Sequence, residues 1–335
     1  MKPLLTVENL AISFLAEQNR LQAVESVSFS LFPGEAVGLV GESGCGKSLT
    51  AQAILGLIAA PPALYDAGKI HFNGEDLRQK SDRELAKIRG KDISMIFQDP
   101  MTALNPVLTI GDQIAESLML HCQMNKTAAL AAAVELLQQV GIPSPEERIL
   151  AYPHQFSGGM RQRAMIAMAL ACRPKLLLAD EPTTALDVTI QAQILALLKK
   201  LQQEKNTAIL FISHDLGAVA TLCQRVLVMY AGTLVEEGAA SEIFHHPGHP
   251  YTKSLLAALP RLQTAGKQKL TAIAGQPPHP GRKPTGCAFH PRCPDAMEVC
   301  AKTAPPYYET ATTSHKIKCW LEHPLAQARR RRRNE

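Results

Sequence analysis

The chain has 335 residues, 46% hydrophobic and 19% charged, so it can bury a sizeable core as one large domain or a domain with an appendix. The five arginines from Arg329 to Arg333 account for the whole formal net charge of +5, so the rest of the chain is close to neutral. Because a terminal run of charge is usually a solvated chain end, we assign no nucleic-acid partner. The N-terminus does not resemble a signal peptide, and no segment approaches the roughly 20 apolar residues that cross a bilayer. We therefore expect a cytosolic protein that reaches a membrane only through partners.

Apolar runs that alternate with helical stretches predict an α/β architecture with a mainly parallel sheet. The N-terminal segment MKPLLTVENLAISF reads as a first strand. The further strands are expected at residues 36–40, 93–97, 176–179, 209–212 and 226–230. The sequence motifs described below then fall at the ends of strands.

The middle of the chain and its C-terminal part differ from this pattern. Residues 98–157 are mostly helical, with an amphipathic stretch at 127–140 closed by Gly141, so we expect a helical subdomain over about residues 99–170. Beyond about Pro260 the composition shifts to Pro, Gly, Cys and His. We therefore divide the chain into a nucleotide-binding domain at 1–258 and a small extension at 259–335.

Residues 41–48 match the phosphate-loop pattern G-x-x-x-x-G-K-[ST] and lie between an expected strand and an expected helix. Backbone N–H groups of such a loop encircle the phosphates, the lysine Lys47 reaches the β- and γ-phosphates, and the Ser48 hydroxyl ligates Mg²⁺. The sequence thus predicts Mg-ATP binding. The remaining loop positions assigned to the nucleotide are Gly41, Ser43, Gly44, Cys45, Gly46 and Leu49.

Two acidic residues follow the apolar strand at 176–179. Asp180 can hold the magnesium shell, and Glu181 can orient and deprotonate the attacking water. A surface acidic pair is the alternative interpretation, which the apolar strand before the pair disfavours.

A Ser-Gly-Gly sequence opens the helix that follows residue 156. Ser157, Gly158 and Gly159 present free N–H groups to an anion, although the phosphate loop already accounts for the phosphates. A second anion site suggests that two chains share each ATP.

Over roughly residues 5–258 these motifs resemble the ABC ATPases. Their signature is similar to residues 156–162, with Met160 where the commonest version has Gln; Gln98 is similar to the Q-loop residue, residues 184–187 to the D-loop, and His214 to the switch histidine. The resemblance implies a RecA-like core, an N-terminal antiparallel β-subdomain and an inserted helical subdomain.

The same resemblance assigns roles to individual residues. It implies that two domains pack head to tail, with the signature of each chain on the partner's ATP. Gln98 would join Mg²⁺ and sense a membrane subunit, and His214 would hold the γ-phosphate and the attacking water. Phe14 is the candidate for stacking on adenine, with packing in the β-subdomain core as the alternative.

Two classes of ABC protein are compatible with these motifs, transporter motors and soluble proteins that act on DNA or ribosomes. The chain has one ATPase domain, and Ser157 follows Gly41 by only 116 positions, without room for a long coiled coil, which favours transport. The absence of transmembrane helices favours an importer. Three segments closely resemble the dipeptide/oligopeptide importer ATPases: residues 97–106, 152–156 and 249–253. The ATPases of nickel and glutathione importers share these sequence motifs.

The resemblance to these importers implies a set of partners and a location. It implies a homologous second ATPase, two permeases and, indirectly, a substrate-binding protein, at the cytoplasmic face of the inner membrane. ATP binding would close the dimer and hydrolysis would reopen it.

Four cysteines lie in the C-terminal extension, separated by five, six and eighteen residues: Cys287, Cys293, Cys300 and Cys319. A reducing cytosol disfavours disulfides, and a short Pro-rich segment benefits from a metal. The spacing lacks the C-x₂₋₄-C pairs typical of structural zinc and suits an iron–sulfur cluster. The peptide-importer resemblance implies a [4Fe–4S] cluster; zinc and unligated buried cysteines are the alternatives.

Overall fold

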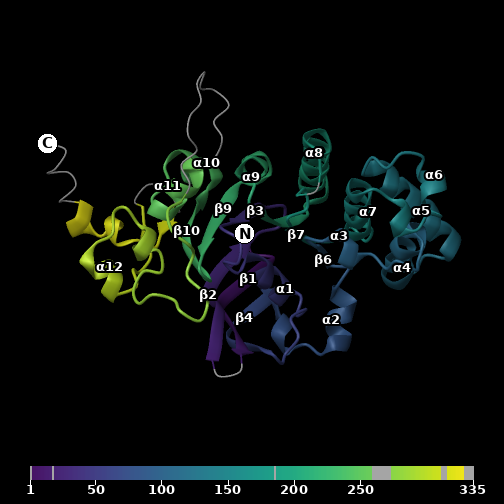
Figure 1. The fold of residues 1–335 in the computed structure, drawn as a ribbon. Helices are drawn as coiled ribbons and strands as arrows, with labels where there is room; N and C mark the ends of the chain where they lie inside the picture. Colours follow the sequence, from purple (N-terminus) through teal and green to yellow (C-terminus); the bar gives the residue numbers. More distant parts are fainter. Residues whose placement is uncertain (1, 17–18, 185, 259–272, 311–314, 328–335) are drawn as a thin grey trace, which may run out of the picture.

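The structure is a computed structural model that describes residues 2–16, 19–184, 186–258, 273–310 and 315–327 (Figure 1). Ala185 of the D-loop-like motif and the arginines Arg329 to Arg333 lie outside the described residues.

The predicted parallel strands form one side of a large mixed sheet. Among the described residues its order is β11-β12-β10-β9-β3-β8-β7-β6, and β9, β3, β8, β7 and β6 run parallel. The five strands predicted after the N-terminal one are confirmed to within one residue at each end, whereas the N-terminal strand begins at Leu5 and ends at Ala16. The parallel strands are β3 (Ala36–Val40), β6 (Ile93–Ile96), β7 (Leu176–Asp180), β8 (Ala208–Ile212) and β9 (Arg225–Tyr230).

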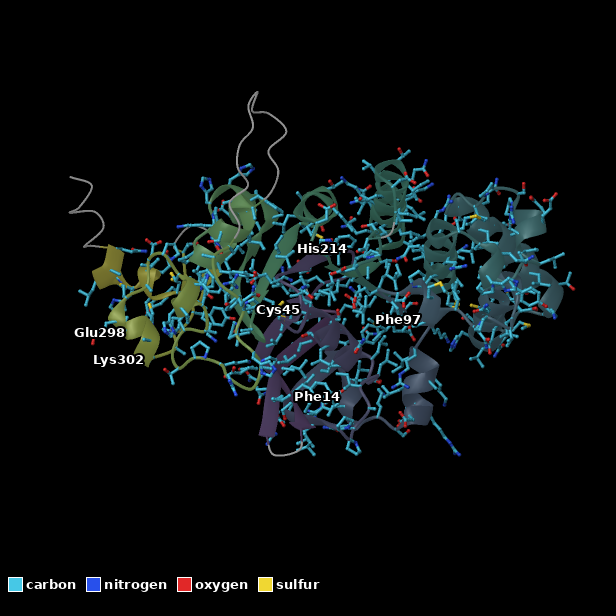
Figure 2. All side chains as sticks on the ribbon, in the orientation of Figure 1. Phe14, Cys45, Phe97, His214, Glu298 and Lys302 are labelled. Atoms are coloured by element: carbon cyan, nitrogen blue, oxygen red, sulfur yellow. The ribbon has the colours of Figure 1, made fainter. Side chains whose placement is uncertain are left out.

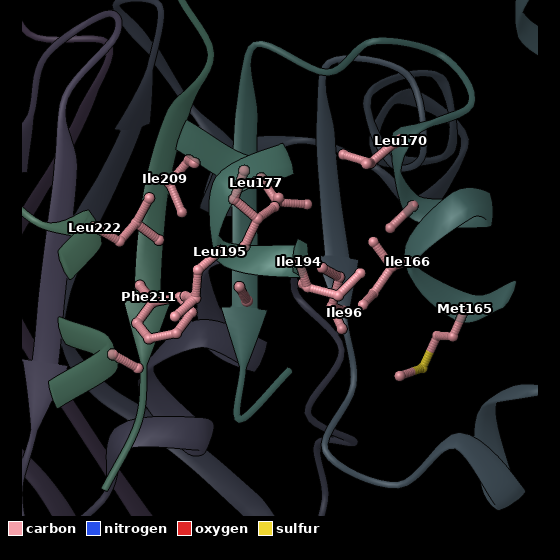
Figure 3. Close-up of a cluster of buried hydrophobic side chains, with 14 of the residues drawn as sticks. Ile96, Met165, Ile166, Leu170, Leu177, Ile194, Leu195, Ile209, Phe211 and Leu222 are labelled. Atoms are coloured by element: carbon pink, nitrogen blue, oxygen red, sulfur yellow. The ribbon is translucent and has the colours of Figure 1, made fainter. Parts of the chain in front are cut away.

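These strands are buried on both faces, as a parallel sheet inside an α/β protein requires. Successive residues of β8 alternate between two cores, with Ile209 and Phe211 in one and Leu210 and Ile212 in the other. Figure 3 shows Phe211 beside Leu195 of the covering helices, and Ile166 of those helices farther along the same cluster, beside Ile194 and Ile96. Those helices are α7 (Gly158–Leu170), α8 (Val188–Lys205) and α9 (Leu216–Leu222).

The other face of the parallel sheet is covered by helix α1 and by an antiparallel sheet of order β2-β1-β4-β5, which confirms the expected N-terminal β-subdomain. Leu10 and Ile12 of this sheet share the second core with Val37 and Leu39 of the parallel sheet. The elements are β1 (Leu5–Ala16), β2 (Asn19–Leu31), α1 (Lys47–Ile54), β4 (Ala63–Phe72), β5 (Glu75–Asp76) and α2 (Asp82–Ile88).

Between β6 and β7 the chain forms a helical region that Figure 1 places at the opposite end of the molecule from the C-terminal segment. The side chains of Thr109, Asn125 and Ser157 each cap a helix by accepting a hydrogen bond from a backbone N–H three residues on. Besides α7, its helices are α3 (Pro100–Ala103), α4 (Ile110–Cys122), α5 (Lys126–Gln139) and α6 (Pro145–Arg148).

The C-terminal segment extends the large sheet instead of standing apart from it. Strand β12 pairs antiparallel with β10, and the buried Glu236 of β10 lies 2.7 Å from Nε2 of His315. Phe289 is fully buried in the same hydrophobic core as Ile209 and Phe211. The remaining elements are β10 (Thr233–Ala239), α10 (Ala240–His245), α11 (Pro250–Ala257), α12 (Glu298–Lys302), β11 (Tyr308–Glu309) and β12 (Lys316–Ile317).

Candidate nucleotide site

The phosphate loop lies at the carboxyl end of β3, and close contacts require two of its glycines, Gly41 and Gly46. Gly41 has a φ of +155°, and a Cβ there would lie 2.2 Å from the Met229 carbonyl oxygen. Gly46 has a φ of +105°, and its Cβ would lie 2.8 Å from Met229 Cε. Side chains are therefore excluded where the backbone must curl around a phosphate.

Lys47 opens helix α1 and is almost completely buried inside the loop. Its Nζ donates to the carbonyl oxygens of Gly41 at 2.8 Å and Glu42 at 3.0 Å. Cys45 is also buried, and burial raises the pKa of its thiol, so it fills space. Ser43 and Gly44 are exposed on the outer side of the loop. The loop thus places a cation beneath an accessible surface, the arrangement that a polyphosphate needs.

Ser48 and Asp180 are brought together from residues 132 apart in the sequence. The Ser48 hydroxyl donates to Asp180 Oδ1 across 3.0 Å. Asp180 is 2% exposed, and burial raises the pKa of its carboxyl group. A hydroxyl and a buried carboxylate oxygen are hard ligands that fit Mg²⁺.

Glu181 contacts two other predicted site residues, Gln98 and His214. Its Oε2 accepts a hydrogen bond from Gln98 Nε2 at 3.2 Å, and its Oε1 lies 3.2 Å from His214 Nδ1. Thr184 donates to Oε2 at 3.1 Å. Glu181 adopts a φ of +49°, and its N–H donates to the Ile212 carbonyl. These contacts fix a largely buried carboxylate at the sheet edge beside Asp180, and Figure 2 labels His214, which contacts it.

The Ser-Gly-Gly sequence begins helix α7, as predicted, but no hydrogen bond of the described residues joins it to the phosphate loop. Ser157 Oγ accepts from the Met160 N–H at 3.3 Å. A Cβ on Gly158 would meet no heavy atom within 4 Å, and one on Gly159 would lie 3.5 Å from Leu186 Cδ2. The start of α7 is therefore open to another molecule.

Phe14 and Leu49 have a different environment from the loop residues. Phe14 of β1 pairs in register with Leu21 and Ala63, is half-buried, and packs against the core between the two sheets. Leu49 packs against the same core from α1. Figure 2 places Phe14 in the β-subdomain, on the side of Cys45 away from His214. The described contacts of both residues are packing contacts, and their roles toward adenine and phosphate stay predictions.

Sequence reasoning missed the residues that hold Glu42 of the loop. Arg292 makes two hydrogen bonds to its carboxylate, and the Glu42 N–H donates to the Tyr251 hydroxyl at 2.8 Å. The sequence does contain one indication of this contact, Glu42 itself, because a carboxylate within a phosphate-binding loop requires a counter-charge.

The four C-terminal cysteines line one cavity, together with His290 and Trp320. Burial raises the pKa of Cys319 to about 12 and of Cys293 to about 11. Among the described residues no group of three or more His, Cys, Asp or Glu is arranged to hold a single metal ion. A separate cavity of about 540 Å³ lies between β2, the β9–β10 turn and the C-terminal segment, and none of its lining residues belongs to the phosphate loop.

Comparisons with known proteins agree with this geometry. Residues 24–184 match the family model described as ABC transporter, and residues 235–300 match the model described as oligopeptide/dipeptide transporter, C-terminal region. The oligopeptide transport ATP-binding protein OppD of Bacillus subtilis is 54% identical over 96% of this chain and 90% of its own length. The chain belongs to the oligopeptide/dipeptide transporter family of ABC ATP-binding proteins.

Other members and solved cassettes support the same assignment. The dipeptide transport ATP-binding protein DppD of Bacillus subtilis is 52% identical over 98% of this chain and 97% of its own length. A dimeric cassette, MJ0796, in a post-hydrolysis state bound to ADP and Pi, is 28% identical, with a TM-score of 0.65 over 70% of this chain and 98% of that one. The chain is thus an ABC ATPase. Within its described residues, no helix is both long and apolar enough to cross a membrane.

Proposed function

We propose that this chain is the ATPase subunit of an importer of dipeptides or oligopeptides and works at the cytoplasmic face of the inner membrane. The observation that carries the proposal is the two-part match, an ATP-binding cassette followed by the C-terminal region described for oligopeptide/dipeptide transporters. Curated relatives named for oligopeptide or dipeptide transport match along nearly the whole chain.

The catalytic roles follow from the positions of the side chains. The loop N–H groups and Lys47 bind the β- and γ-phosphates, and Ser48, Asp180 and Gln98 hold Mg²⁺, which neutralises phosphate charge when bound. Glu181 accepts the proton of the attacking water, and His214 orients that water at the γ-phosphate. The hydrogen bonds from Ser48 to Asp180 and from Gln98 to Glu181 support this assignment.

The nucleotide site is completed by a second chain. Ser157, Gly158 and Gly159 bind the nucleotide held by the phosphate loop of a homologous ATPase subunit, and the open start of α7 supports this role. ATP binding closes the head-to-tail dimer, closure drives two permeases that receive cargo from a substrate-binding protein, and hydrolysis reopens the dimer.

Within this assembly the chain divides into the nucleotide-binding domain at 1–258, its helical subdomain at about 99–170, and the extension at 259–335. Cys287, Cys293, Cys300 and Cys319 hold a [4Fe–4S] cluster, with zinc as the alternative. Support comes from the common cavity that these four side chains line and from sulfur ligands, which such clusters require.

Isolation of the full chain from native membranes tests the function. A second ATPase and two permeases should be recovered with it, and peptide-loaded binding protein should stimulate ATP hydrolysis by the reconstituted assembly. Recovery of ribosomes or DNA-repair proteins without permeases would contradict transport. Stimulation by nickel or glutathione instead of peptides would reassign the cargo.

A further inference from the structure

The phosphate loop contains a carboxylate at its second position. Glu42 lies between Gly41 and the exposed Ser43, and its side chain is 24% exposed. A carboxylate this close to a bound triphosphate would repel it, and the repulsion is strong where the surroundings are partly desolvated. Something must therefore compensate the charge of Glu42.

Arg292, from the C-terminal segment, supplies the compensation across 250 residues of sequence. Its Nη1 lies 2.6 Å from Glu42 Oε2 and its Nη2 lies 2.9 Å from Glu42 Oε1. This two-point geometry is the strongest form of an arginine–carboxylate pair. The Arg292 side chain is only 5% exposed, so solvent screens the pair weakly.

The guanidinium of Arg292 is itself held in place by the fold. Its Nε donates to the Ala274 carbonyl at 2.9 Å, and its Nη1 lies 3.3 Å from the Tyr230 hydroxyl. The guanidinium carbon also lies 5.8 Å from the Tyr230 ring centre and 5.9 Å from that of Phe289. The arginine is therefore already oriented before any nucleotide arrives.

The backbone of the loop has supports that do not involve Arg292. The Glu42 N–H donates to Tyr251, and the Gly232 N–H donates to the Cys45 carbonyl at 2.9 Å. The shape of the loop is thus fixed by other groups, whereas the charge and direction of the Glu42 carboxylate depend on Arg292.

We propose that Arg292 is a positioning residue for the ATPase, which neutralises Glu42 and holds its carboxylate away from the triphosphate. The proposal rests on the proposed binding of ATP by this loop. Arg292 belongs to the C-terminal segment, where it directly precedes Cys293 and packs on Phe289. The proposal therefore makes this segment a determinant of ATP affinity.

The test is a fluorescence titration of the full chain with Mg-ATP. Arg292→Met should weaken ATP binding about tenfold, the scale of losing a charged hydrogen-bonding partner. The double variant Glu42→Gln with Arg292→Met should recover to within about threefold of the original affinity, since no unpaired carboxylate remains. In the assembled transporter Arg292→Met should raise KM and leave kcat within about twofold, because Glu181 is untouched.

Controls separate this role from a structural one. Arg282→Met changes an exposed arginine of the same segment and should bind ATP normally. Arg292→Lys keeps the charge and should stay within about threefold of the original affinity. If Arg292→Met folds poorly, Arg292→Gln replaces it, with the same tenfold loss expected. Lys47→Ala tests the proposed function alone and should abolish binding.

Two results would overturn the proposal while the proposed function stands. One is unchanged ATP affinity in Arg292→Met when Lys47→Ala has lost it. The other is a double variant that binds ATP as weakly as Arg292→Met, which would make the arginine a folding element of the C-terminal segment. If Lys47→Ala still binds ATP, the proposed function itself fails.

Discussion

The Ser48 hydroxyl donates a 3.0 Å hydrogen bond to Asp180 Oδ1 and so joins the first turn of α1 to the last residue of β7. The next residue after that strand is Glu181, which turns with a positive φ and meets Gln98 and His214. The proposed magnesium-site residue Asp180 and the proposed water-activating carboxylate of Glu181 are therefore neighbours at one strand end.

Glu181→Gln should retain ATP binding and lower ATP turnover by about 10²-fold or more, the scale expected when a water-activating base is removed. Turnover is measured as phosphate release by the assembled transporter, and binding by titration of the full chain. Glu204→Gln, an exposed carboxylate at the end of α8, is the matched control and should turn over normally. Near-normal turnover of Glu181→Gln would refute the assigned role.

Gly158→Asp should leave ATP binding by the isolated chain unchanged and should lower ATPase activity of the assembled transporter at least about tenfold. A Cβ at this position would have no tertiary neighbour within 4 Å, so the fold should be preserved. The added carboxylate would face the partner's triphosphate, where like charges repel. Titration of the isolated chain with ATP checks the unchanged binding, and phosphate release by the assembled transporter checks the lowered ATPase activity. Full activity of the assembly would argue against a shared site.

Glu236→Gln should destabilise the chain by about 3 kcal/mol, the scale of weakening hydrogen bonds to a buried charged group. Burial alone would raise the pKa of Glu236, but hydrogen bonds from His315 and from the Gly248 and His249 backbone outweigh it and lower the pKa below 4.5. A lowered folded-state pKa gives stability that is present above about pH 4.5 and lost as pH falls through the folded value.

Urea unfolding at several pH values between 3 and 7 measures both effects. The loss of stability below about pH 4.5 should be shallower in Glu236→Gln than in the original chain. Glu309→Gln, an exposed carboxylate on the neighbouring β11, should behave like the original chain. A pH dependence in Glu236→Gln as steep as that of the original chain would contradict the assignment.

Anaerobically purified protein should contain about four irons and four acid-labile sulfides per chain, as a [4Fe–4S] cluster requires. Cys300→Ser removes one proposed cluster ligand, which is buried, and should lower both contents, whereas Cys122→Ser, at an exposed cysteine outside the cavity, should not. Iron and sulfide assays give the comparison. One zinc per chain with no sulfide would establish the alternative metal.

Local patterns in the sequence predicted the strands and the loop because their causes are local. The run Ala36–Val40 is apolar throughout because both faces of β3 are covered, and Gly41 and Gly46 follow because Met229 leaves no room for side chains there. Asp180 and Glu181 were placed correctly since polar residues at the carboxyl ends of parallel strands converge on one edge.

The contacts that the sequence did not predict join distant segments. Strand β12 has only two residues, Lys316 and Ile317, too few to show a period, yet it pairs with β10. Arg292 likewise lies in a Pro-rich segment whose composition says nothing about Glu42. Such pairings depend on how the segment docks, which residue periodicity does not encode.

The placement of β12 beside β10 has a consequence for biosynthesis. The ribosome must add roughly 80 residues after β10 before β12 exists, on the order of ten seconds at typical elongation rates. During that interval the hydrogen-bonding groups on one side of β10 are unpaired, and Glu236 lacks His315. Such an edge can pair with other chains, so each nascent ATPase passes through a brief period in which its sheet is most exposed to aggregation.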